Sequence, residues 1–177
     1  MMSPRVRGLL VGRFQPFHSG HLGTVREIRS RAPTSELILA IGSAEQSYTL
    51  ENPFTASERF EMISRALAES RVDGVMPVPV PDIHRHSLWV RHLEGLLPPF
   101  ETVYTNNPLT RLLFENAGYR VESPTLIDRD RFEGRKIRAL LAAGRSLAGA
   151  VPPAVAAYLE EIHAPARLRL LSSAEPA

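Results

Sequence analysis

The segment GRFQPFHSGH, residues 12–21, joins a predicted strand to a predicted helix. The residues before it, 6–12, form a short and mostly apolar run that ends in glycine, which is typical of a buried strand. Apolar residues then recur at helical spacing over residues 20–32. The segment is therefore a strand–turn–helix connection that places His18 and His21 at the first turn of a helix.

Four further strand-like runs alternate with amphipathic segments along the chain. The expected strands cover residues 37–41, 74–82, 101–107 and 119–123. The expected helices cover residues 53–70, 87–97, 108–118, 132–146 and 152–164. Alternation of this kind predicts βαβ units and a parallel sheet. We expect a Rossmann-like, doubly wound α/β fold with five strands in the order 3-2-1-4-5 and C-terminal helices.

The third expected strand carries three prolines, Pro77, Pro79 and Pro81. Proline removes a ladder donor, so this strand is expected at an edge of the sheet. In the order 3-2-1-4-5 the switch point lies between strands one and four, and ligands bind beyond the carboxyl ends of the strands there. The turns GRFQPFH and TNNP are therefore expected to face each other across one crevice.

The composition is that of an ordinary soluble protein, with 44% hydrophobic and 23% charged residues. We expect one domain over residues 1–177, with a core over about 5–163 and a tail over 164–177, of which the last dozen residues are expected to fray. Two helix caps are expected, at Thr55 or Ser57 and at Ser87, and Phe60 is expected on a buried helix stripe.

Charge and cysteine content narrow the function. The chain has no cysteine, which excludes disulfides, cysteine-zinc sites and thiol catalysis. Its net charge of +2 comes almost entirely from arginine, since Lys136 is the only lysine. This balance favours small polyanionic ligands over nucleic acid. No apolar run approaches the ~18 residues of a membrane span, and the N-terminus lacks a signal-peptide pattern, so we expect a cytoplasmic protein.

The two histidines of HSGH admit several interpretations: metal ligands, a proton shuttle, phosphate binders or an ordinary helix start. A helix N-terminus offers free N–H groups and a positive dipole end, which together attract anions. Gly20 leaves room for a ligand, and Arg13 adds a guanidinium fork suited to phosphate. This setting favours phosphate binding by His18 and His21, with the ordinary helix start left as the alternative.

The chain resembles the archaeal-type nicotinamide-nucleotide adenylyltransferases of the HxGH superfamily. The resemblance runs from about residue 7 to about residue 162. It rests on an ordered set of segments: GRFQPFHSGH, GSAEQSYTLENPFTASER, PVPDIH, SLWVRH and PPFETVYTNNPL. It implies transfer of AMP from ATP to nicotinamide mononucleotide, which gives NAD and pyrophosphate. It also implies Mg²⁺ bound mainly through the ATP phosphates, and a homo-oligomer, commonly a hexamer.

The resemblance further implies functions for individual residues. The implied catalytic residues are His18, His21, Arg13 and Arg138. The implied ATP-binding residues are Gly12, Arg13, Phe14, Gln15, His18, His21, Gly42, Ser43, Asn107, Pro108, Arg135 and Arg138. The implied mononucleotide-binding residues are Phe54, Thr55, Arg59, Asp82, Ile83 and Trp89. An indole can stack on a nicotinamide ring, although Trp89 as a core residue is the alternative.

One segment departs from the family pattern. The family usually opens its late helix with an SGTxxR-like phosphate-binding sequence, whereas this chain has EGRKIR at residues 133–138. Arg135 and Lys136 can replace the missing hydroxyls with charge-assisted hydrogen bonds. Glu133 should repel a triphosphate unless it faces solvent or helps to hold Mg²⁺ through water. The alternatives are therefore a nucleotide-binding sensor with an impaired loop, or a related enzyme with a pantetheine-phosphate, FMN or glycerol-phosphate acceptor.

A second group of histidines, His84, His86 and His92, follows the third strand. A zinc site would need further ligands and second-shell carboxylates, and only Asp82 is nearby in sequence. We therefore expect a surface loop with nucleotide contacts and no metal held by protein ligands.

Overall fold

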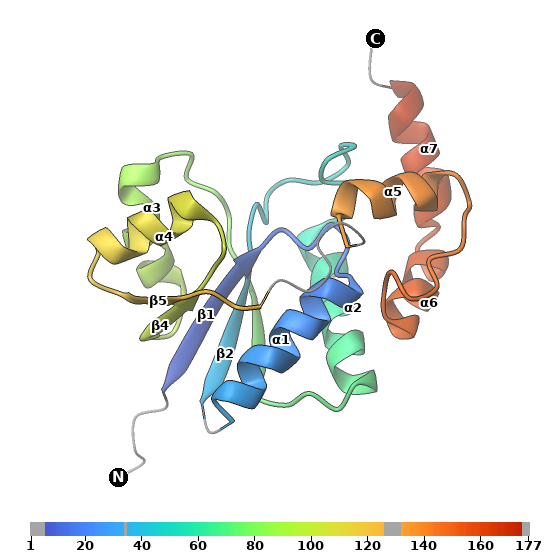
Figure 1. Ribbon diagram of the computed structural model, residues 1–177. Helices are drawn as coiled ribbons and strands as arrows, with labels where there is room; N and C mark the ends of the chain where they lie inside the picture. The colour runs from blue at the N-terminus through green and yellow to red at the C-terminus, as the bar shows by residue number, and fades with distance from the viewer. Residues whose placement is uncertain (1–5, 34, 126–131, 175–177) are drawn as a thin grey trace.

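The computed structural model describes residues 6–33, 35–125 and 132–174. Its parallel strands form one five-stranded sheet in the order β3-β2-β1-β4-β5 (Figure 1), which confirms the predicted topology. The strands are β1 (Arg7–Gly12), β2 (Glu36–Ile41), β3 (Val75–Pro79), β4 (Thr102–Tyr104) and β5 (Arg120–Glu122). The order reverses between β1 and β4, so the carboxyl ends of these two strands flank the switch point.

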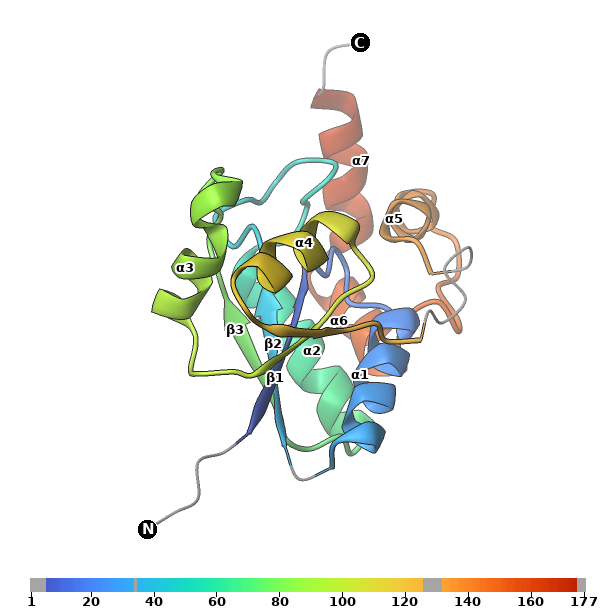
Figure 2. The same ribbon diagram turned by 60° about the vertical axis from the view of Figure 1, so that its left-hand side comes forward.

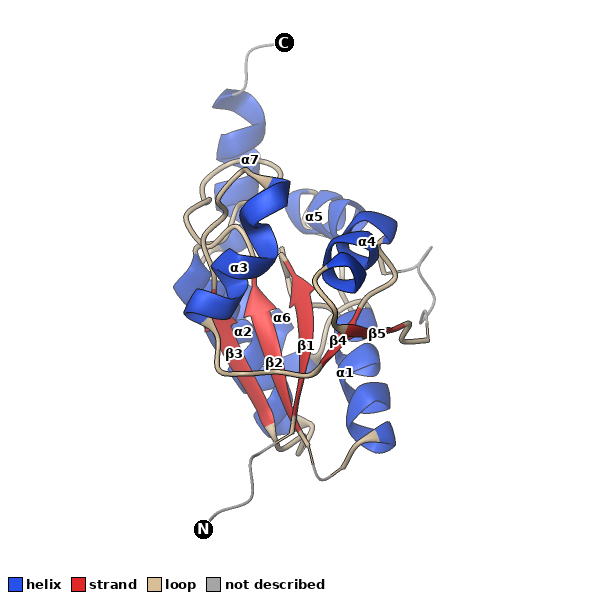
Figure 3. Cartoon of the chain, turned by 90° about the vertical axis from the view of Figure 1, so that its left-hand side faces the viewer, coloured by secondary structure: helices blue, strands red, loops and turns tan. Residues whose placement is uncertain are grey.

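Helices cover both faces of the sheet (Figure 3). They are α1 (Ser19–Arg31), α2 (Ala56–Glu69), α3 (His86–Leu96), α4 (Pro108–Asn116), α5 (Gly134–Ala142), α6 (Pro153–Glu161) and α7 (Ala164–Ala174). The inner strand β2 is buried on both sides, because its side chains alternate between the two faces of the sheet and helices cover both faces. Leu37, Leu39 and Ile41 pack in the cluster with α1, α2 and the C-terminal helices. Ile38 and Ala40 pack in the cluster with α3 and α4.

The proline-rich strand β3 lies at the sheet edge, as predicted. It pairs with β2, where Pro77 faces Leu39 and Pro79 faces Ile41 in the register. A proline has no N–H to donate, and an edge strand can leave that side of its ladder unpaired.

Two details at the helices differ from expectation. Thr55 does cap α2: its Oγ1 accepts the backbone N–H of Glu58 at 3.2 Å. The predicted Ser87 cap is wrong, because α3 begins at His86 after Arg85 and has no side-chain cap. Phe60 is 40% exposed and is not on the buried face. That face carries a fully buried arginine instead, whose hydrogen bonds are described below.

The expectation that the last dozen residues fray is wrong for residues 166–174, which belong to the helix α7. Ala164 and Leu168 are buried in the core beside α6, and α7 lies next to α5 (Figures 1 and 2). The spacing of four residues between Ala164 and Leu168 is the helical signal that the sequence contains. The helix is stable because it packs against the rest of the fold, since short helices are marginal alone.

Candidate active site at the switch point

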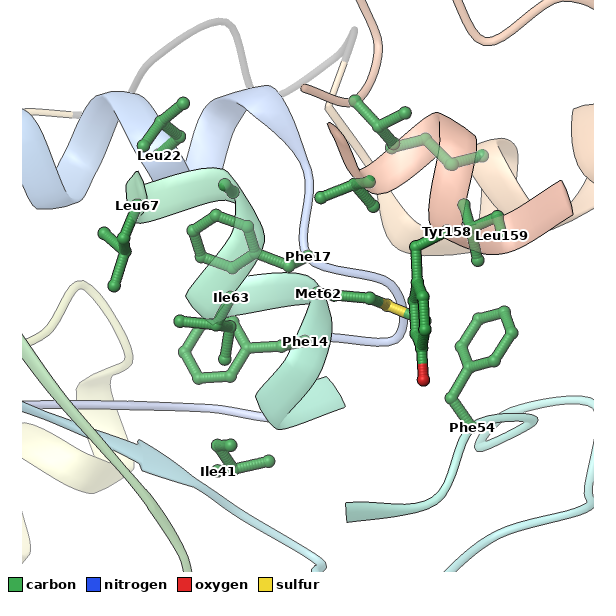
Figure 4. Packing of buried hydrophobic residues seen from close by; sticks show 14 of the residues in the cluster. Phe14, Phe17, Leu22, Ile41, Phe54, Met62, Ile63, Leu67, Tyr158 and Leu159 are labelled. Carbon is green, nitrogen blue, oxygen red and sulfur yellow. The ribbon is translucent and has the colours of Figure 1, made fainter. Parts of the chain in front are cut away.

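The turn after β1 is anchored by two buried phenylalanines. Phe14 and Phe17 point into the core beside α2 (Figure 4), with exposed fractions of 2% and 0%. A Cβ on Gly12 would come within 2.6 Å of the Phe14 ring, so this position requires glycine. Arg13, which directly precedes Phe14, keeps 58% of its side chain exposed. The turn therefore holds its rings inward and presents Arg13 to solvent.

His18 and His21 cap each other at the start of α1. The backbone N–H of His21 donates to Nδ1 of His18, and the backbone N–H of His18 donates to Nδ1 of His21, both at 3.2 Å. The rings stack with centroids 3.4 Å apart. Because each Nδ1 accepts a hydrogen bond, a neutral ring carries its proton on Nε2. Both imidazoles are thereby fixed as Nε2–H donors.

Burial keeps this pair neutral. It lowers the pKa of His18 to about 4, and this effect outweighs that of a backbone hydrogen bond, which raises the pKa. The pKa of His21 is well below its ordinary value, first because of burial and then because of the neighbouring His18. At neutral pH the site therefore contains two uncharged donors, and its positive charge comes from arginine.

These shifts predict a loss of stability in acid. A histidine whose pKa is lower in the folded state opposes folding when it is protonated, so its contribution is intact above about pH 6.5 and declines as the pH falls towards 4. At about pH 5 the shift of His18 corresponds to roughly 2 kcal/mol of unfolding free energy. We expect the melting temperature to fall more between about pH 7.5 and pH 5 in the parent chain than in His18→Asn. An equal fall in both would contradict this assignment.

Gly20, which was predicted to leave room for a ligand, is covered by the chain itself. A Cβ at this position would lie 2.8 Å from Cβ of Phe132 and 3.2 Å from Cε1 of His18. The Phe132 ring is parallel to the ring of His18, with centroids 6.2 Å apart. Glycine is thus needed here for close packing of the segment before α5 on the histidine pair.

Gln15 joins the turn after β1 to the loop before α2. Its side-chain Nε2 donates to the carbonyl of Phe54 at 2.9 Å, and its Oε1 accepts the Phe54 N–H at 3.0 Å. Arg138 of α5 donates from Nη1 to the carbonyl of Gln15 at 2.8 Å. Gln15 is 5% exposed and Phe54 is fully buried. These two residues therefore hold the turn and the loop in place from within the protein, and their side chains offer almost no surface to a ligand.

Arg59 is also buried in the protein interior and has no exposed surface. Its Nη1 donates to the carbonyls of Arg13 at 2.9 Å and Gly42 at 2.7 Å, and its Nη2 donates to that of Ser43 at 3.0 Å. Burial lowers its pKa to about 10, which leaves it charged at neutral pH. The backbone N–H of Gly42 in turn donates to the carbonyl of Gly12 at 2.9 Å. Arg59 thus joins the ends of β1 and β2 and does not line the predicted mononucleotide pocket.

A cationic groove of about 560 Å³ lies between the loop before α2, α5 and α7. Its lining residues are Leu50, Glu51, Arg135, Arg138, Ala139, Ala142, Leu168 and Ser172. Burial, followed by the charge of the nearby Arg13, lowers the pKa of Arg138. Crowded guanidinium groups of this kind provide a binding site for an anion. Arg13 reaches towards the groove through Glu51, whose Oε2 is 3.9 Å from its Nη1.

Glu133 directs its carboxylate to its own neighbours. Its oxygens lie 3.4 Å from Nε of Arg135 and 3.3 Å from Nζ of Lys136. The Arg135 side chain is 81% exposed and that of Lys136 is 53% exposed, so these pairs are weak. A phosphate can therefore compete with Glu133 for both cations at little cost.

A second pocket, of about 250 Å³, lies between α3 and α4. Its lining residues are Asp82, His84, Arg85, His86, Trp89, Asn107, Leu109, Thr110 and Leu113. Trp89 is half-buried and meets Phe114 edge to face at 5.5 Å, so it contributes both to the pocket and to the core. Ser43 fixes Asp82 by donating to Oδ2 at 2.6 Å.

The remaining predicted residues have structural contacts of their own. Asn107 caps α4 by accepting the N–H of Thr110 at 2.9 Å, and Pro108 is the first residue of that helix. The hydroxyl of Thr55 is engaged as the cap of α2. Ile83 is half-buried next to Asp82 and does not line the pocket.

A small pocket of about 180 Å³ lies between the ends of β1 and β4. It brings Gly12 and His21 together with Thr24, Thr105 and Asn106, none of which was predicted individually as a site residue. Thr105 and Asn106 belong to the TNNP turn, so the predicted meeting of the two turns is confirmed. Asn106 rather than Asn107 faces the histidine side.

The described part of the chain contains no group of three histidine, aspartate or glutamate residues that could hold a metal ion. His92 contacts the carbonyl of Pro81 at 2.7 Å through Nε2, and His84 is 3.8 Å from Glu45. Among the same residues, no helix has the length and hydropathy to cross a bilayer.

The cytidylyltransferase-like family matches residues 9–143, a range that includes the switch point of the sheet and the histidine pair. A nicotinamide-nucleotide adenylyltransferase from Picrophilus torridus is 45% identical over 170 residues, which are 96% of this chain and 99% of the relative. One from Haloarcula marismortui is 43% identical over 170 residues, 96% of this chain and 89% of the relative. The chain belongs to the nicotinamide-nucleotide adenylyltransferase family.

A solved structure has the same fold at much lower identity. It is a bifunctional NMN adenylyltransferase/ADP ribose pyrophosphatase from Francisella tularensis, complexed with AMP and a manganese ion. The TM-score is 0.76 at 18% identity, and the match covers 95% of this chain. The chain spans about half of that protein, 52% of its length.

Proposed function

We propose that this chain transfers AMP from ATP to nicotinamide mononucleotide, giving NAD and pyrophosphate. The observation that carries the proposal is the neutral pair of Nε2–H donors at the start of α1, together with Arg138, which donates to the Gln15 carbonyl in the turn before that helix and lines the cationic groove. Family membership supports the choice of substrates. The whole chain would act as one nucleotidylyltransferase domain.

The reaction needs no nucleophile from the protein, because the mononucleotide phosphate is already anionic at neutral pH. One of its oxygens attacks the α-phosphorus of ATP in line, and the bond to the bridging oxygen of pyrophosphate breaks. His18 and His21 would donate to oxygens that gain charge in the transition state, while Arg13 and Arg138 hold the phosphates. Catalysis then consists of positioning and charge stabilisation.

The substrates would occupy the three pockets around the carboxyl ends of the strands. The triphosphate would follow the arginine-lined groove, and the adenosine part would approach the β1–β4 pocket near His21 and Asn106. The nicotinamide would enter the pocket with Trp89 and Asp82. A divalent ion, which we propose is Mg²⁺, would neutralise the phosphates. A homo-oligomer and a cytoplasmic location complete the proposal.

The direct test is to measure NAD formation and pyrophosphate release from ATP, Mg²⁺ and nicotinamide mononucleotide. Parallel reactions should contain pantetheine phosphate, FMN or glycerol phosphate, and we expect turnover with the nicotinamide nucleotide alone among these. Turnover with another acceptor would reassign the substrate. Tight ATP binding without pyrophosphate release would indicate a sensor.

Trp89→Leu is expected to raise KM for nicotinamide mononucleotide about 10-fold, with kcat little changed, because stacking of a base on an aromatic ring contributes about 1–3 kcal/mol. The matched control is Leu88→Ala on the same helix, since Leu88 is 44% exposed and lines none of the site pockets. A lower melting temperature with an unchanged KM would show instead that Trp89 is a core residue.

A further inference from the structure

Arg167 reaches from α7 to the start of α2. Its Nη1 and Nη2 donate to the two carboxylate oxygens of Glu58, each at 2.7 Å. The side chains of Arg167 and Glu58 are only 16% and 15% exposed. A bidentate and shielded pair of this kind is stronger and more directional than an exposed ion pair. Glu58 is also part of the α2 cap, since its Oε2 accepts the N–H of Thr55 at 2.9 Å.

The same guanidinium also contacts the loop of residues 43–55, which we call the crossing loop. Nη1 of Arg167 donates to the carbonyl of Pro53 at 3.2 Å. The guanidinium carbon lies 5.0 Å from the centre of the Tyr48 ring and 5.9 Å from that of Phe54, within the range of cation–π contacts. Arg167 therefore contacts the crossing loop at two separate places, near its middle and at its end.

The crossing loop touches both sides of the candidate active site. At its start, Ser43 holds Asp82 at 2.6 Å. At its end, Phe54 is bonded twice to Gln15, whose carbonyl accepts from Arg138. A displacement of the Pro53–Phe54 end would therefore move Gln15 and loosen Arg138.

The helix α7 also forms one wall of the cationic groove. Leu50 and Glu51 of the crossing loop lie opposite Leu168 and Ser172 of α7 in its lining, with Arg138 of α5 beside them. This wall lies beyond residues 9–143, the part that the cytidylyltransferase-like family matches. The C-terminal helix therefore contributes to the site through residues outside the matched region.

We propose that Arg167 is a positioning residue for ATP binding. It holds the crossing loop so that Gln15 and Arg138 keep the groove in its phosphate-binding shape. The inference rests on the proposed function, because it takes the groove to be the triphosphate site. Arg167 itself lines none of the pockets around the site and acts through the loop.

The test compares steady-state kinetics of Arg167→Gln, Arg167→Lys and the control Arg169→Gln with the parent chain. Arg169 is exposed on the same helix, and its guanidinium donates to the carbonyl of Ala142 at 3.3 Å. We expect Arg167→Gln to raise KM for ATP about 10-fold while kcat changes less than about 3-fold. Arg167→Lys keeps the charge without the fork, so its KM should be intermediate. Arg169→Gln should match the parent.

A purely structural contribution would give a different result. It would lower the melting temperature and the active fraction, and hence the apparent kcat, with KM for ATP unchanged, and that result would overturn the proposal. If Arg167→Gln does not fold, Glu58→Gln breaks the same ion pair from α2 and keeps an acceptor for Thr55, so it should show the same rise in KM. An inactive parent chain would instead refute the proposed function.

Discussion

Replacing His18 with asparagine is expected to reduce kcat by about 100- to 1000-fold and to leave the melting temperature at neutral pH almost unchanged. Asparagine can accept the N–H of His21 as Nδ1 of His18 does, at 3.2 Å in the parent chain. It has no group at the position of Nε2, so it removes the donor without removing the cap. The measurements are kcat from pyrophosphate release and thermal unfolding of the same preparation.

His18→Gln is the matched control, because it is expected to keep a donor near the position of Nε2 and to lose the cap acceptor at the position of Nδ1. The glutamine amide can extend to the Nε2 position, but the chain then lacks an acceptor at the position of Nδ1. We expect this variant to keep more turnover than His18→Asn and to lose about 1 kcal/mol of stability from the cap. Ser30→Ala, at the exposed far end of α1, should change neither quantity.

If His18→Asn retained full turnover with unchanged ATP affinity, the histidine pair would be a capping device alone. The reciprocal cap makes that a real alternative, since the two hydrogen bonds already explain why both residues favour a helix start. Only the loss of turnover at constant stability identifies Nε2 as the functional atom.

The sequence predicted the topology well because the relevant signals are local. The strands β1 and β2 are mostly apolar runs, the helices α1 and α2 repeat apolar residues every three or four positions, and the prolines of β3 mark an edge. The HSGH turn and the TNNP turn follow β1 and β4, so the doubly wound order brings them together.

The parts that the sequence did not predict depend on contacts between distant segments. Arg59 was expected in the mononucleotide pocket, yet it is buried against carbonyls 16 to 46 residues away. Phe132 covers Gly20 from a segment more than a hundred residues later. Among the residues of α7 whose burial is described, 164–173, two are strongly buried, Ala164 and Leu168, too few for a periodic pattern to stand out.

Arg59→Met is expected to lower the free energy of unfolding by about 3–5 kcal/mol. The guanidinium donates to the carbonyls of Arg13, Gly42 and Ser43 at 2.7–3.0 Å, and methionine fills its space without donating to any of them. Buried carbonyls without donors carry their full desolvation cost. Denaturant-induced unfolding of the parent and variant measures the difference.

The same change should reduce turnover even where the variant is fully folded, because the lost bonds join the ends of β1 and β2 directly behind Arg13. Arg59→Lys should be intermediate, since one ammonium group cannot span the oxygens that the planar fork reaches. The control Arg65→Met lies on the same helix, and its partners Glu61 and Glu161 are half-exposed or exposed. It should therefore lose far less stability than Arg59→Met. Equal losses in the two variants would show that the buried hydrogen bonds of Arg59 contribute no more than a surface ion pair, and the assignment of Arg59 as the tie between the two strand ends would then be wrong.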